Sequence, residues 1–186
     1  MKSKVIQVVT VVFLLLSCQK GIKPEVYVKY IDTGNQIATN AQAVLLSNVA
    51  AAIQQGGPSY AIEFCNLKAS GITDSLSKVH QSTISRISAK NRNPENGLKT
   101  ETDILVWKIF ETYNLTDTLL QAGNNLVYYK TIKTAMPACL KCHGSPGTDI
   151  DSLTIARLNN LYPSDKATGY LLNDFRGLWK IEFPAE

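Results

Sequence analysis

The most informative motif of the sequence combines two cysteines with a histidine. Cys139, Cys142 and His143 have the spacing C-x-x-C-H, which is typical of the attachment site of a c-type heme. In such a site the two thiols add to the vinyl groups of the porphyrin, and the adjacent histidine is carried beneath the ring, where its imidazole binds iron. The sequence therefore predicts one covalent heme c, with Cys139 and Cys142 as thioether residues and His143 as the proximal iron ligand.

Two other chemistries use the same residue types. A thioredoxin-like redox pair places C-x-x-C between a strand and a helix, but the glycine- and proline-rich segment 144–147 that follows here cannot continue a long helix. A zinc site would need a fourth ligand, and the adjacent Cys142 and His143 diverge awkwardly for one tetrahedral ion. We favour heme and keep zinc and the redox pair as alternatives.

The second axial ligand of the iron must come from a short inventory. The histidines are His80 and His143, and the methionines are Met1 and Met136. Met136 is close in sequence to the first thioether cysteine and is not expected to reach the opposite face of the ring, which disfavours Met/His ligation. The candidates are Cys65, His80 or an open position.

Cys65 and His80 are expected in different surroundings. Helical periodicity over 58–69 places Cys65 on an apolar stripe with Ala61 and Ile62. A buried free cysteine is more often a small core residue than a ligand, yet the shortage of other ligands keeps Cys65 as a candidate. His80 lies in a polar stretch, where a histidine is usually exposed to solvent.

The N-terminal residues are typical of an export signal. Lys2 and Lys4 precede a mostly apolar run, 5–16, that is too short to span a membrane as a helix and suits a secretory signal. The run ends at Cys18, and residues 15–18 resemble the cleavage box of bacterial lipoproteins, in which the cysteine is lipidated.

These features predict the domain organisation and the location of the protein. We expect a signal peptide over 1–17, a lipidated N-terminus and tether over 18–31, and a single folded domain over 32–186. The protein would be exported and anchored by the lipid on Cys18 to a bacterial membrane, facing the periplasm or the cell surface. A plain signal peptide with an incidental Cys18 is the alternative.

Composition and charge restrict the function classes. With 45% hydrophobic and 18% charged residues, the 186-residue chain has the balance of an ordinary folded protein. The formal net charge is +4, and two of the positive charges, Lys2 and Lys4, fall in the segment expected to be removed. So small a surplus gives no electrostatic case for nucleic-acid binding. If Cys18 carries lipid, the remaining cysteines are odd in number, so at least one thiol should be free, reactive or a ligand.

Hydrophobic periodicity predicts an α+β fold in which helices pack on a small antiparallel sheet. The first helix should end at Gly56-Gly57, and turns are expected over 91–97. The predicted helices cover 32–55, 58–69 and 100–113, and the predicted strands cover 83–88, 126–132 and 178–183.

Several segments, taken together and in this order, resemble a family of single-heme c-type proteins with a PAS-like sensory domain. They are Ala61–Cys65, Arg86–Asn96, Cys139–Gly144, Tyr162–Tyr170 and Asp174–Gly177. The resemblance implies a PAS-like antiparallel sheet flanked by helices with one covalent heme, His143 as the proximal ligand, and Cys65 as the distal ligand facing iron from a helix. The family's domain occurs alone or ahead of histidine kinases, so here any transmitter would be a separate protein. Just before the Asp174–Gly177 segment, Asn173 stands at a position where glycine is common in the family, a difference that concerns only the local turn.

Other residues are candidates for contacts with the porphyrin. Near the family segments lie the cations Arg86, Lys90, Arg92 and Arg176. Arg92 and Arg176 are our candidates for pairing with heme propionates, because arginine suits bidentate carboxylate recognition; a solvated surface charge is the alternative for each. Four aromatic residues could line the heme pocket, but the default interpretation is that they belong to the hydrophobic core: Trp107, Tyr128, Tyr129 and Trp179.

Two functions follow from these predictions. The first is a redox or small-ligand sensor with His/Cys-ligated iron, whose coordination change is read by a separate signal-transducing protein; the second is a low-potential periplasmic electron-transfer cytochrome with a redox partner. A thiolate ligand lowers the reduction potential, and its loss on reduction would admit a small gaseous ligand. An enzyme is not expected, since a peroxidase needs a distal acid or base and His80 is the sole histidine left for that role.

Overall fold

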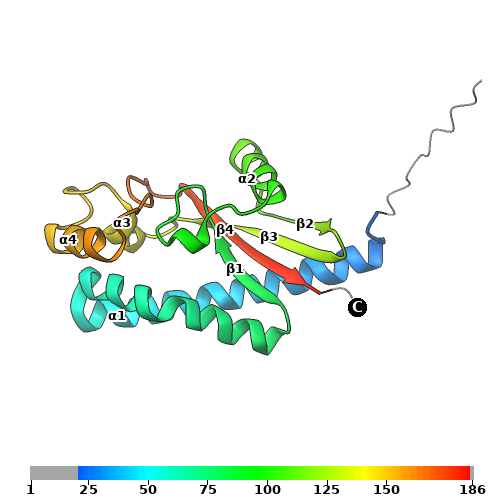
Figure 1. The fold of residues 1–186 in the computed structure, drawn as a ribbon, viewed down its shortest axis with the longest axis horizontal. Helices are drawn as coiled ribbons and strands as arrows, with labels where there is room; N and C mark the ends of the chain where they lie inside the picture. The colour runs from blue at the N-terminus through cyan, green and yellow to red at the C-terminus, as the bar shows by residue number, and fades with distance from the viewer. Residues whose placement is uncertain (1–20, 185–186) are drawn as a thin grey trace, which may run out of the picture.

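A four-stranded antiparallel sheet carries helices on both of its faces (Figure 1). This arrangement comes from a computed structural model that describes residues 21–184. The strand order is β1-β4-β3-β2. The strands are β1 Thr83–Ile87, β2 Asp117–Ala122, β3 Asn125–Lys133 and β4 Phe175–Phe183. The helices are α1 Pro24–His80, α2 Glu101–Tyr113, α3 Pro137–His143 and α4 Ser152–Leu161, with a short 3-10 turn at Pro94–Asn96.

Helix α1 is bent into two arms that lie along one face of the sheet. The bend is at Gly56-Gly57, where the backbone leaves the helical region and Gly57 has a φ of 74°. Figure 1 shows the second arm running back beside the first, and the Asn40 and His80 side chains meet across them at 3.4 Å. The predicted helix break is therefore confirmed, while the second arm continues to His80 instead of ending near Ala69.

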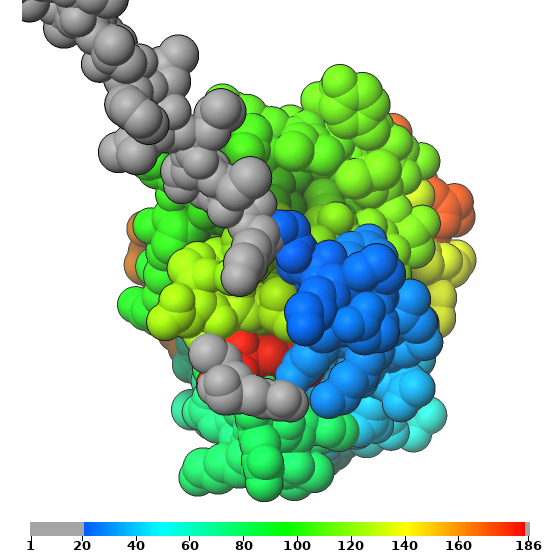
Figure 2. Space-filling model, turned by 90° about the vertical axis from the view of Figure 1, so that its right-hand side faces the viewer, coloured from blue at the N-terminus to red at the C-terminus, as the bar shows by residue number. Residues whose placement is uncertain are grey.

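The first arm begins earlier than the sequence indicated. It starts at Pro24, and Ile22, Tyr30 and Ile31 pack against the core of the domain. The ring of Tyr30 lies 4.9 Å from that of Phe183, measured between centroids. Figure 2 shows the first turns of α1 in blue beside the β2–β3 hairpin, with β4 in red between them. The folded region thus includes residues 22–31, which the sequence assigned to the tether; Cys18 and the signal peptide lie outside the described residues.

Successive residues of β3 pack on opposite faces of the sheet, as strand geometry requires. Tyr128 packs against the first arm of α1, where it touches the backbone at Gly34 so closely that no side chain would fit there. On the opposite face, Tyr129 belongs to a second hydrophobic core together with Trp107 and Phe110 of α2. The two tyrosines and Trp107 are therefore core residues, which confirms the default interpretation for these three.

Helix α2 starts at a capping box, a pattern that satisfies free backbone N–H groups at a helix start. The Thr100 side chain accepts a hydrogen bond from the Asp103 N–H, and the Asp103 carboxylate accepts one from the Thr100 N–H. The helix predicted over 100–113 and the α+β class are both confirmed. The strands predicted near 83, 126 and 178 are also present, whereas β2, α3 and α4 had not been predicted. Within residues 21–184, no helix is long and apolar enough to cross a membrane.

Candidate functional site

Helix α3 places the three residues of the C-x-x-C-H motif on one face. Pro137 occupies its first turn, where a missing N–H costs nothing, and the helix ends at His143 before Gly144. Residues three and four apart in a helix are neighbours on its surface, so Cys139, Cys142 and His143 point the same way. All three line one cavity, and both thiols are free.

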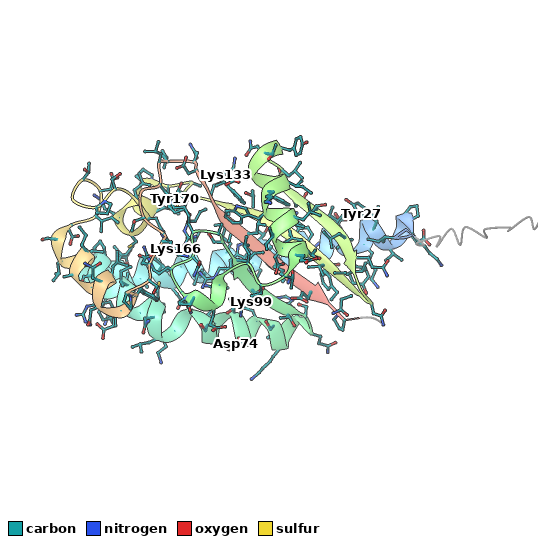
Figure 3. The ribbon with its side chains drawn as sticks, turned by 45° about the horizontal axis from the view of Figure 1, so that its top comes forward. Tyr27, Asp74, Lys99, Lys133, Lys166 and Tyr170 are labelled. Atoms are coloured by element: carbon teal, nitrogen blue, oxygen red, sulfur yellow. The ribbon has the colours of Figure 1, made fainter. Side chains whose placement is uncertain are left out.

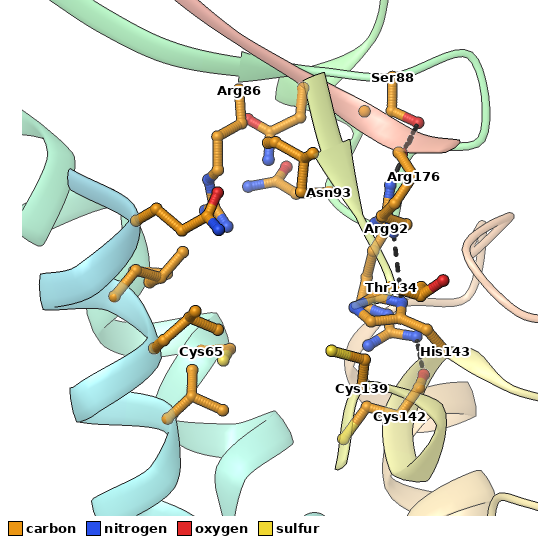
Figure 4. A pocket seen from close by; sticks show the side chains of 18 of the residues that line it. Cys65, Arg86, Ser88, Arg92, Asn93, Thr134, Cys139, Cys142, His143 and Arg176 are labelled. Carbon is orange, nitrogen blue, oxygen red and sulfur yellow. Dashed lines mark hydrogen bonds between the residues drawn. The ribbon is translucent and has the colours of Figure 1, made fainter. Parts of the chain in front are cut away.

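The cavity lies between α3, the bend of α1 and the near end of the sheet. Its volume is about 250 Å³. Figure 4 shows Cys65, on the second arm of α1, facing Cys139 and His143 across it. The wall that α1 contributes is mostly apolar and includes Leu45, Leu46, Val49, Ile53, Ala61, Ile62 and Ala69. An apolar cavity with a few convergent polar groups is the usual form of a cofactor site.

Of the predicted candidates for the distal position, the structure brings Cys65 to the cavity. Burial raises the pKa of the Cys65 thiol, while the charges of Arg86 and Arg92 act to lower it. His80 is not among the residues that line the cavity; it ends α1 and contacts Asn40. Met136 reaches the rim, where it is 43% exposed.

His143 is held in one orientation and one tautomer. Its Nδ1 lies 2.8 Å from the carbonyl oxygen of Ala167 and 3.4 Å from the Nε of Arg176. The shorter contact decides the tautomer: since a carbonyl oxygen only accepts, Nδ1 carries the proton and donates to it, which leaves Nε2 unprotonated. Burial, followed by the charges of Arg176 and Arg92, holds the pKa of His143 well below its usual value. The neutral imidazole with a free Nε2 is the form that binds a metal, and the hydrogen bond to Ala167 is the typical outer support of such a ligand.

The segment 165–170 is built against the end of α3. The Gly169 N–H donates to the Gly144 carbonyl oxygen at 2.8 Å, and the Tyr170 N–H donates to that of His143 at 2.9 Å. The Tyr170 ring stands perpendicular to the His143 ring. Figure 3 shows Lys166 and Tyr170 at the end of the molecule opposite Tyr27. Sequence reasoning did not assign this support to Ala167, because a backbone carbonyl leaves no signature in residue type.

Arg92 ties the same segment to α3. Its Nε lies 3.0 Å from the Asp165 carboxylate in a largely buried ion pair. Its Nη2 donates to the carbonyl oxygens of Cys142 and Ala167. Arg92 was predicted as a propionate contact; its guanidinium is directed at these protein groups, and the propionate contact stays a prediction.

Arg176, the other predicted propionate contact, lies beside His143. Its Nη1 donates to the Ser88 hydroxyl oxygen at 3.1 Å and to the Lys90 carbonyl oxygen at 3.3 Å. Its guanidinium also lies 5.3 Å from the centre of the Tyr170 ring. Burial lowers the pKa of this arginine. Arg176 thus lines the cavity while it is hydrogen-bonded to Ser88 and Lys90. Its propionate contact also stays a prediction.

A small apolar cluster holds α3 and α4 against the second arm of α1. Ile62 of α1 packs with Ile150, Leu158 and Tyr162, and Cys142 packs against this group. Burial raises the pKa of the Cys142 thiol to about 11, although the nearby Arg92 charge opposes the shift. This cluster sets the position of the motif relative to Cys65.

Within residues 21–184, no three side chains of His, Cys, Asp or Glu converge as the ligands of one metal ion would.

The chain is similar to proteins of one described family. A family model described as Tll0287-like: Tll0287 matches residues 23–184. The crystal structure of the cyanobacterial heme-protein Tll0287 is similar in fold, with a TM-score of 0.61 and 20% sequence identity, covering 88% of this chain and 97% of that one. A comparison with curated proteins found no significant match. Because the family model spans nearly all of the described residues, this chain belongs to the Tll0287-like family.

Proposed function

We propose that this chain binds one heme c covalently, through thioethers at Cys139 and Cys142, with His143 as the proximal iron ligand. One observation carries the proposal: the two thiols and the free Nε2 of His143 share one face of α3 and line the same largely apolar cavity. The similar structure of a protein that is described as a heme-protein supports it. The residues present therefore fit a porphyrin held by the C-x-x-C-H segment.

Each residue has a separate task in this proposal. The two cysteines hold the porphyrin edge, the Ala167 carbonyl keeps His143 oriented, and Arg92 joins the end of α3 to the segment that carries Ala167. When bound, the heme would supply one-electron redox chemistry and an iron that could exchange a ligand. Cys65, which faces α3 across the cavity, is the proposed distal ligand.

Mass spectrometry and spectroscopy test the cofactor and its ligands. Protein made with a working heme-ligation pathway should carry one porphyrin adduct, which Cys139→Ala combined with Cys142→Ala should abolish. Optical and EPR spectra should show a low-spin thiolate signature in the wild type and in His80→Ala, and this signature should be lost in Cys65→Ala. A thiolate signature that persists in Cys65→Ala would contradict the assignment of the distal ligand.

We further propose that the protein is a membrane-anchored sensor module and not an enzyme. Support comes from the origin of the distal ligand: Cys65 belongs to an α1 arm that is joined to the first arm at a glycine bend and continues towards β1. A change in ligation at Cys65 would therefore act on a long element that a separate partner protein could read. The PAS-like character of the domain and its exported, lipid-anchored state remain part of the proposal.

A ligand-binding measurement separates a sensor from an electron carrier. For a sensor, reduction should weaken the Cys65 bond, so that carbon monoxide changes the optical spectrum of the reduced protein. In Cys65→Ala, carbon monoxide should bind the reduced protein faster than in the wild type, because no sulfur competes. Fast electron self-exchange with a spectrum that carbon monoxide does not change would instead favour the electron carrier.

A further inference from the structure

Arg86 is a charged side chain in the cavity that has no carboxylate partner among residues 21–184. The sequence contains four arginines. Two of them form ion pairs: Arg92 with Asp165 and Arg157 with Glu63. Arg176 is bonded to a hydroxyl and a carbonyl oxygen. Arg86 lies in β1 and pairs with β4 through its backbone, but its side chain makes neither a hydrogen bond nor an ion pair with any residue of 21–184. Its one ring contact among these residues is with Trp179, at 5.8 Å from the ring centre.

The Arg86 side chain is partly buried, and an unpaired guanidinium is unfavourable in such a place. Arginines are almost never buried unless they are paired, because removing a charge from water costs more than a weak contact with an aromatic ring returns. Burial accordingly lowers the pKa of Arg86. Because the side chain borders the cavity, a carboxylate placed in the cavity would supply the ion-pair partner that no carboxylate of residues 21–184 provides.

Asn93 adds a second donor at the same place. Its side-chain oxygen accepts a hydrogen bond from the Glu95 N–H at 3.0 Å. This bond identifies which side of the amide is oxygen, so the NH₂ group is the side left for another acceptor. Asn93 lines the cavity with Arg86, and Figure 4 shows both at its sheet end. A planar guanidinium beside an amide donor suits a carboxylate.

The position of these donors matches the shape of a porphyrin held by the motif. Heme carries its vinyl groups and its two propionates on opposite edges of the ring. Cys139 and Cys142, which would take the vinyl edge, lie at one end of the cavity, and Arg86 and Asn93 lie at the other (Figure 4). A heme attached at α3 would therefore direct its carboxylates towards the sheet.

We propose that Arg86 and Asn93 form a carboxylate-binding site at the sheet end of the cavity, and that this site takes a propionate of the heme. The inference rests on the proposed function and adds the residues that hold the far edge of the cofactor. It adds Arg86 to Arg92 and Arg176, for which the sequence predicted propionate contacts; unlike Arg86, Arg92 is already engaged with Asp165 and two carbonyl oxygens.

Resonance Raman spectroscopy of the heme-loaded protein tests this site, because the propionate bending bands respond to hydrogen bonds at the carboxylates. Arg86→Gln should shift one of these bands and lower the reduction potential, since loss of the compensating cation favours ferric iron. Arg86→Lys should leave the reduction potential closer to the wild-type value than the band position, because lysine retains the positive charge but lacks the planar guanidinium that can donate two parallel hydrogen bonds. The matched control is Arg157→Gln, which removes an arginine outside the cavity and should change neither quantity.

A second variant keeps the test decisive if Arg86→Gln folds poorly. Asn93→Asp retains an oxygen for the Glu95 N–H but replaces the amide donor with a carboxylate, which should repel the propionate and shift the same band. If heme is attached and the propionate bands of Arg86→Gln and Asn93→Asp both match the wild type, the inference is wrong while the proposed function stands. If mass spectrometry finds no heme on the wild-type chain, the proposed function itself fails.

A small anion from solution is the alternative to a heme propionate as the occupant of the Arg86–Asn93 site. Titrating acetate or inorganic phosphate into the wild-type holoprotein should leave the propionate bands and the reduction potential unchanged if a propionate fills the site. A potential that depends on the added anion in the wild type, and loses this dependence in Arg86→Gln, would overturn the assignment to a propionate.

Discussion

At the scale of single residues, Asp103 shows how a buried charge is stabilised on the side of the sheet away from the cavity. The side chain is 1% exposed. It accepts hydrogen bonds from the Tyr129 hydroxyl at 2.9 Å and from the Thr100 N–H at 3.3 Å, and it pairs with the Lys180 ammonium at 3.1 Å. Burial alone would raise the pKa of Asp103, but the bonds to Lys180 and Tyr129 outweigh burial and lower it.

This lowered pKa predicts a loss of stability in acid. A carboxyl whose pKa is lower in the folded than in the unfolded state stabilises the fold above its unfolded value, about 4, and loses that contribution as the pH falls through the folded value. The free energy of unfolding should therefore decrease below about pH 4, and Asp103→Asn should flatten this decrease. Denaturant unfolding at a series of pH values measures it. Asp74→Asn, which changes an exposed carboxylate of α1, is the control, and an equal flattening there would contradict the prediction.

The capping residue Thr100 gives a second prediction. Thr100→Ala removes the side-chain acceptor that the Asp103 N–H uses at the start of α2, and losing such a cap costs about 1 kcal/mol. Thermal or denaturant unfolding should show this decrease. Thr112→Ala, on the exposed end of the same helix, should be neutral or slightly stabilising, since alanine favours a helix.

At the scale of elements, the bend of α1 determines which residues reach the cavity. The first arm supplies part of the apolar wall, and the second arm supplies Cys65. At Gly57 the backbone has φ 74° and ψ −175°, a combination that is essentially restricted to glycine. A residue with a side chain at Gly57 would strain the bend and with it the spacing between the arms.

Gly57→Ala should therefore destabilise the fold by about 1–3 kcal/mol. The matched control is Gly71→Ala, at an exposed position in the second arm where an added Cβ meets no atom within 4 Å. That change should stabilise the helix by up to about 1 kcal/mol. Equilibrium unfolding of both variants measures the difference, and an equal effect of the two substitutions would show that the bend is not strained by a side chain.

The elements also show where sequence patterns succeed. Helix α2 was predicted to within a residue, because a regular series of apolar residues marks it locally. Strand β2 was not predicted, because its residues lack a clear alternation and its strand conformation is completed by pairing with β3. Asn173, where the resemblance led us to expect a glycine, adopts a φ of 69°. Asparagine tolerates this left-handed region better than most residues.

At the scale of the whole molecule, membrane attachment and cofactor binding should be separate properties. Cys18 precedes the described residues, whereas the candidate heme residues are in the domain that follows. Cys18→Ser should therefore release the protein from membranes without changing its heme content. Membrane fractionation and the heme absorbance per protein measure the two properties, and a joint loss of anchor and heme would argue against their independence.

Residue types and their spacing along the chain were sufficient to predict covalent heme attachment. Cys139, Cys142 and His143 are neighbours in the sequence, so their relative placement depends on a single helical turn. The same local information predicted an α+β domain and a break at Gly56-Gly57. It also reduced the distal ligand to Cys65, His80 or an open position.

Folding in three dimensions decided the contacts between residues that are distant in sequence. The bend of α1 and the cluster around Ile62 place Cys65 opposite α3 and leave His80 outside the cavity. Two more long-range contacts are the hydrogen bond that orients His143 on the Ala167 carbonyl and the bond between Arg92 and Asp165. Arg86 has no such carboxylate partner among residues 21–184. Such contacts depend on how helices and sheet pack against each other, and a pattern of neighbouring residue types carries no record of that packing.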